Sequence, residues 1–153
     1  MKEKNRISDL YRQLYNGKPW IDVTIAGTLK KINAAKAAKR VSPKLNTIWE
    51  ITLHLISWRK NVLERMQGKV IVTPAHNYFL KVGDTSPEAW LNTLKQFDKV
   101  QEDWLQYLDG IKKSDLEKVY EPNSMTNYTQ IQGILQHDAY HLGQIVLLAK
   151  MIR

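Results

Sequence analysis

The chain has 153 residues and a formal net charge of +8, with 43% apolar and 25% charged residues. A chain of this size and composition is typical of one globular domain that buries roughly two-thirds of its unfolded surface, so we expect a single domain over residues 1–153. Cysteine is absent, which excludes disulfides, thiolate metal ligands and a cysteine nucleophile. Any metal would have to be held by His, Asp or Glu.

Two features of the sequence bear on location and partners. The N-terminal MKEKNRISDLYRQLY lacks the apolar stretch of a secretory signal, and no run of about 18 apolar residues occurs, so we expect a cytoplasmic protein with no membrane partner. Basic residues gather from Lys30 to Lys44, within a segment that has no acid between Asp22 and Glu50. This segment is either a solvated face or a surface for anionic partners. Nucleic acid is not expected, because no nucleic-acid-binding motif accompanies the charge.

Apolar residues recur at helical spacing in four segments, of which the first covers residues 5–16. A mixed stretch with short helical pieces near 25–32 and 34–39 follows. The second helix begins with Thr47 and Glu50 in a T-x-x-E capping box and stops at Gly68. A polar loop over residues 69–85 separates it from the third.

The third helix begins with Ser86 as its cap and Pro87 in its first position, and it extends to Gly110. Asn127 and Gln130 form a second capping-box pattern, from which the fourth helix runs to the C-terminus. The alternating stretch KVIVT is too short to build a sheet. The sequence therefore predicts an all-α fold, a four-helix bundle with a long connection between helices one and two.

Two histidines interrupt the apolar stripe of the last helix. In ILQHDAYHLGQIVLL, His137 and His141 lie four positions apart, which places their Cβ atoms about 6 Å apart on one helix face. Their apolar neighbours indicate that both point inward, where a polar group needs a partner. Such a pair can bind a metal ion or form ordinary hydrogen bonds, and its spacing alone does not separate the two.

His54 is also expected to point inward, from the second helix, because it lies three residues after Ile51 and four before Trp58. It too could bind a metal ion or form ordinary hydrogen bonds. Three inward histidines from two helices form a donor set for one divalent metal ion, since facing helices of a bundle supply ligands to an interior metal. Three protein ligands leave positions open for water or substrate, as in catalytic sites. The alternative is a helical interaction module in which the histidines are structural.

Three further residues near these histidines have two interpretations each. Glu50 could orient His54 or shuttle a proton, or it could act only as the capping-box partner of Thr47. Gln144 could hold a water or a substrate, or lie at an ordinary polar position on the edge of the bundle. Trp58 could wall a pocket or pack in the core.

Asp138 and His76 are not expected to bind the metal. HDAYH is similar to the H-E-x-x-H of zinc proteases, but Asp138 is one methylene shorter than the glutamate, and we expect it to be exposed or to contact a ligand from outside. His76, in the loop after the second helix, is expected on the surface, unless the loop folds over the open end of the bundle and brings it near the metal.

The stretches NTIWEITLHLISWR and QHDAYHLGQI resemble the DinB-like superfamily, also described as YfiT-like or S-transferase-like metalloenzymes. The resemblance spans nearly the whole chain, and H-x-x-x-H-x-G-Q is its more specific motif. It implies a four-helix bundle that binds one divalent metal ion through His54, His137 and His141. It also implies that dimers are common, so we expect a homodimer.

The resemblance implies either a hydrolase that depends on zinc or nickel, or a transferase that uses a low-molecular-weight thiol of the bacillithiol type. A metal held by three neutral imidazoles can lower the pKa of a bound water or thiol, which makes either one a nucleophile toward a small-molecule substrate. Without cysteine in the chain, the thiol must come from a small molecule. The alternative is a non-enzymatic helical module that binds anionic partners through Lys30–Lys44.

Overall fold

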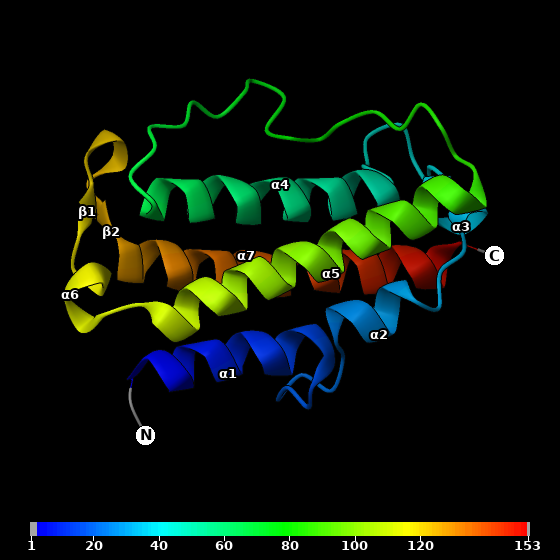
Figure 1. Cartoon of the computed structure of the whole chain (residues 1–153). Helices are drawn as coiled ribbons and strands as arrows, with labels where there is room; N and C mark the ends of the chain where they lie inside the picture. Colours follow the sequence, from blue (N-terminus) through cyan, green and yellow to red (C-terminus); the bar gives the residue numbers. More distant parts are fainter. Residues whose placement is uncertain (1–2, 153) are drawn as a thin grey trace.

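The computed structural model describes residues 3–152 and confirms the all-α fold. In the described part of the chain, four long helices form the bundle: α1 (Glu3–Asn16), α4 (Ile48–Met66), α5 (Pro87–Gly110) and α7 (Asn127–Met151). Helices α4 and α5 run in one direction, and α1 and α7 run in the other (Figure 1). The long connection from α1 to α4 contains two short helices, α2 (Ile25–Leu29) and α3 (Ala34–Ala38).

The connection from α5 to α7 contains structure that the sequence pattern did not predict. It consists of α6 (Lys113–Leu116), β1 (Val119–Tyr120), the 3-10 turn η1 (Glu121–Asn123) and β2 (Met125–Thr126). The two strands pair antiparallel, with Val119 opposite Thr126. Strands of two residues are too short to produce a visible alternation. KVIVT lies in the loop after α4 and forms no strand.

Side-chain caps define the starts of α4 and α5 as predicted. The Thr47 hydroxyl accepts from the Glu50 backbone N–H at 3.1 Å, while the Glu50 carboxylate accepts from the Thr47 N–H at 2.8 Å. Ser86 caps α5 in the same way through the Ala89 N–H. After the last turn of α4, Gly68 adopts a φ of +91°, a conformation that residues with a Cβ rarely adopt.

The start of α7 corrects the prediction that Asn127 and Gln130 form its capping box. Thr126 is the cap, and its hydroxyl accepts from the Thr129 N–H at 3.1 Å. The Asn127 side chain instead donates to the Asp115 carbonyl, which ties α7 to α6. Gln130 is buried, and neither atom of its side-chain amide has a hydrogen-bond partner within the described residues, so it does not complete a capping box.

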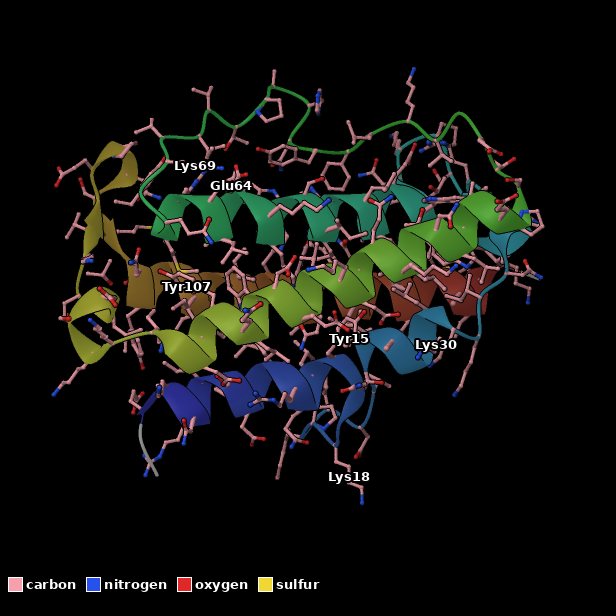
Figure 2. The ribbon with its side chains drawn as sticks, viewed as in Figure 1. Tyr15, Lys18, Lys30, Glu64, Lys69 and Tyr107 are labelled. Carbon is pink, nitrogen blue, oxygen red and sulfur yellow. The ribbon has the colours of Figure 1, made fainter. Side chains whose placement is uncertain are left out.

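Aromatic side chains fill much of the interior between the long helices. Trp49 and Trp90 pack edge to face between α4 and α5, with ring centroids 5.0 Å apart. Tyr15, labelled in Figure 2 where α1 meets α5, donates its hydroxyl to Asp98 at 2.8 Å. No helix within residues 3–152 is long and apolar enough to cross a membrane.

A fully buried ion pair joins α4 to α7. The Arg59 Nε donates to Asp138 Oδ2 at 2.9 Å, and Nη2 lies 2.7 Å from the same oxygen. Nη1 donates to the Gln101 side chain from α5, and the guanidinium also lies over the rings of Tyr11 and Phe97, both at 5.4 Å. Asp138 is therefore buried, and the expectation that it could be exposed is wrong.

We predict that Arg59→Met destabilises the protein strongly, because Asp138 would remain charged in the interior. Breaking one partner of a buried pair typically costs about 3–5 kcal/mol, and urea denaturation should show a loss of that size in the free energy of unfolding. Arg12→Met is the control, since it breaks the exposed pair with Asp109 and should cost less than about 1 kcal/mol. Equal losses in the two variants would contradict a stabilising role for the buried contact.

Candidate metal centre

The three predicted histidines come together between α4 and α7. His54, His137 and His141 each offer one ring nitrogen, and these three nitrogens lie within 4.8 Å of one another. The Nε2 atoms of His54 and His137 lie 2.8 Å apart. His54 and His141 are buried, whereas His137 is partly exposed and forms the outer edge of the cluster.

Hydrogen bonds orient two of the three imidazoles. His54 donates from Nδ1 to the backbone carbonyl of Asn77 at 2.6 Å, and His141 donates from Nδ1 to the Gln144 side-chain carbonyl at 2.6 Å. A neutral imidazole that donates from Nδ1 carries its lone pair on Nε2, so both rings present an acceptor nitrogen to the cluster. This is the arrangement in which histidine binds a metal.

The third imidazole faces an unused acceptor. His137 Nδ1 and Asp138 Oδ1 are both buried and without a hydrogen-bond partner among the described residues, and they lie 3.9 Å apart. A shift of about 1 Å would bring them within hydrogen-bond distance. Asp138 thus stands beside a candidate ligand, as expected for a residue that contacts a ligand from outside.

Burial lowers the pKa of two of the imidazoles and so keeps them neutral. Desolvation lowers the pKa of His54 from 6.5 to about 4, and the nearby rings of His137 and His141 act in the same direction. Desolvation also lowers the pKa of His141. Both side chains are therefore in the ligand-competent form at neutral pH.

The donor set fits a small divalent cation. Two imidazole nitrogens that share a tetrahedral zinc at about 2.0–2.1 Å lie roughly 3.3 Å apart, close to the separation of the His54 and His137 nitrogens. With no acidic ligand, three neutral imidazoles leave the positive charge of the ion uncompensated. That charge is what a metal needs in order to polarise a ligand.

The loop over residues 69–85 completes the surroundings of the cluster. Phe79 stacks flat on His54, with ring centroids 4.0 Å apart and planes at 6°. Trp58 donates from Nε1 to the Asn77 side chain at 3.0 Å and lies edge to face with His137. The loop runs along the outer side of α4 (Figure 1), and its contacts with His54 were not predicted.

Of the remaining candidate residues, some contact the histidine cluster and others do not. Gln144 contacts a candidate ligand directly, whereas Glu50 caps α4 and pairs with Arg40, so the structure supports its capping role. His76 is exposed, accepts from the Tyr78 N–H and does not belong to the cluster, as expected for a surface histidine. The basic residues from Lys30 to Lys44 are exposed on and around α2 and α3.

A family model describing the DinB superfamily matches residues 24–145, which include all three histidines. The chain belongs to the DinB superfamily. The resemblance seen in the two histidine-containing stretches is thereby confirmed, and the matched range covers most of the bundle from α2 onward. No match was found among curated proteins or among solved structures.

A groove of about 290 Å³ opens beside the cluster of this DinB protein, lined in part by Trp58 and His137. Trp58 thus forms part of a pocket wall, one of its two predicted roles. A larger hollow of about 730 Å³ lies near Ile111 and Tyr128 but contains none of the three histidines. The smaller groove is therefore the relevant approach to the candidate metal centre.

We predict that His54 makes the stability of chelator-treated protein depend on pH. Its pKa is 6.5 in the unfolded chain and about 4 in the folded one, so the unfolded chain binds more protons between these values. The free energy of unfolding should therefore fall as pH decreases from about 6.5 toward 4. Urea denaturation at several pH values measures this slope.

The slope should become shallower in His54→Leu and stay unchanged in His76→Leu, which removes an exposed histidine outside the cluster. A slope in His54→Leu equal to that of the wild type would show that burial does not shift the protonation of this ring.

Proposed function

We propose that this DinB protein is a metal-dependent enzyme in which His54, His137 and His141 hold one divalent ion. The observation that carries the proposal is the convergence of three ring nitrogens within 4.8 Å, in a cluster where two rings are oriented by hydrogen bonds from Nδ1. Histidine donors suit zinc and nickel, which we propose ahead of copper and iron. A homodimeric state and a cytoplasmic location remain predictions from the sequence.

The reaction that we propose is attack by an activated small nucleophile on a small-molecule substrate. A divalent ion, when bound, supplies Lewis acidity that brings the pKa of a ligated water or thiol toward neutrality. A thiol gives an S-transferase of the bacillithiol type, and a water gives a hydrolase. The absence of cysteine in the chain requires that a thiol nucleophile enter as a low-molecular-weight cosubstrate.

The protein side chains have defined tasks in this proposal. The Asn77 carbonyl and the Gln144 side chain keep the proton of their histidines on Nδ1, so that Nε2 stays available to the ion. Phe79 and Trp58 cover His54 and exclude water from that side. His137 is the partly exposed member, so a substrate in the groove beside it would reach a bound ion from that side.

We predict that untagged protein carries about one divalent ion per chain, the stoichiometry of a site with three histidine ligands. His137→Ala and His141→Ala should each lose most of this metal in elemental analysis, because only two ligands remain. Their helical circular dichroism should persist, since α7 keeps its apolar contacts. His76→Ala is the matched control and should retain the metal; full occupancy in both ligand variants would refute the proposal.

The absorption spectrum of cobalt-substituted protein distinguishes a thiol nucleophile from a water nucleophile. If the site activates a thiol, adding a low-molecular-weight thiol should produce a thiolate-to-cobalt charge-transfer band, and the band should be missing in His141→Ala. If the cobalt spectrum does not respond to any thiol, water is the nucleophile and the hydrolase is the remaining assignment.

A further inference from the structure

The groove beside His137 has one charged residue of fixed sign, Arg65. Among its described lining residues there is no carboxylate, and its walls are largely apolar, formed by Trp58, Val62, Met125 and Ile134. An apolar groove with one placed cation selects an organic anion that has an apolar body. The net charge of +8 further favours the approach of an anion.

Arg65 is held in place without being neutralised. Its guanidinium lies over the rings of Trp58 and Tyr120, at 5.4 and 5.0 Å from their centroids, and Nη2 donates to the Thr73 hydroxyl at 3.1 Å. None of the ion pairs found within residues 3–152 involves Arg65. Its Nε is buried and has no acceptor among the described side chains and backbone. Arg65 lines the groove, and a positioned guanidinium without an acidic partner is suited to a carboxylate.

The helix geometry gives the axial spacing between the backbone positions of His137 and Arg65. Because α4 and α7 are antiparallel (Figure 1) and Arg59 faces Asp138, His137 lies level with the Arg59 turn of α4. Arg65 is six residues farther along, or about 9 Å at 1.5 Å per residue. Figure 2 labels Glu64, near the C-terminal end of α4.

We propose that Arg65 anchors the carboxylate of the substrate, so that the enzyme acts on small organic acids. The apolar body of the acid lies over Trp58, Val62 and Ile134, and its reactive end reaches the histidine cluster at His137. This inference deepens the proposed function, on which it rests, by naming the substrate class of the same site.

The test compares 4-phenylbutanoate with its neutral isostere 4-phenylbutanamide by isothermal titration calorimetry. Wild type should bind the acid more tightly than the amide by about tenfold, the size of one hydrogen bond to a charged group. Chelator-treated protein should keep this preference, because the carboxylate is held by Arg65 and not by a metal. Equal affinities, or no binding of either probe, would overturn the proposal.

Arg65→Met should remove the preference, and Arg65→Lys should restore part of it. Lys60→Met, which removes an exposed cation from the same helix, should retain it. A preference that persists in Arg65→Met, or that is lost from wild type on chelation, would place the anion elsewhere and overturn the proposal.

Failure of the Arg65 proposal can be distinguished from failure of the proposed metal-dependent function. Metal content is measured by elemental analysis, and the preference for the acid is measured without metal. Metal-free wild type that discriminates acid from amide through Arg65 supports the anchor even if no ion is found. Normal metal content together with equal binding of the acid and the amide overturns the proposed role of Arg65 but does not affect the proposed metal centre.

Discussion

Arg59 and Asp138 form an ion pair from which water is excluded, and this pair sets the register of α4 against α7. Burying two charges is costly, and the cost is offset only while the geometry of the contact is kept. Sliding α7 by one turn would separate the charges and leave both unpaired in the interior. Because His137 is adjacent to Asp138 and His54 lies five residues before Arg59, the same constraint fixes how the three imidazoles meet.

The ion pair and the histidine cluster have opposite electrostatic requirements within one layer of the core. The pair needs full charges, whereas the cluster needs neutral rings, which burial of His54 and His141 provides by lowering their pKa values. The Arg59 guanidinium contacts Oδ2 of Asp138, whereas Oδ1 lies on the side of His137. A cation at the cluster would therefore find a carboxylate behind one ligand and no competing anion among the others.

Much of the bundle and part of the site could be predicted because their signals are local. The Thr47 and Glu50 box starts α4, and the four-residue spacing of His137 and His141 places both rings on one face. His54 could be added because it lay on the buried side of another helix. The burial of Asp138 was not predicted, although a signal was available: Ile134, Asp138 and Leu142 follow one stripe, as Leu55, Arg59 and Val62 do on α4.

The contacts made by the loop over residues 69–85 have no recognisable pattern in the sequence. The partner of His54 is a backbone carbonyl 23 residues away, and any residue at position 77 could supply that group. Its placement depends on Asn77 and Tyr78, which adopt left-handed φ values of 49° and 61°. Asparagine tolerates that conformation better than most residues, but the preference indicates a turn and not the ring it will contact.

The three histidines are unequally buried, so the cluster is accessible from one side only. Phe79 and Trp58 cover His54, and Gln144 holds His141 from the far side, so His137 alone borders the groove. In the proposed reaction, a substrate in the groove would be held by the charge of Arg65 at one end and would meet the imidazoles at the other. Orientation of this kind contributes to rate because the reacting atoms meet without a further search. The rigid register imposed by Arg59 and Asp138 is what keeps the two ends of the groove at a constant separation.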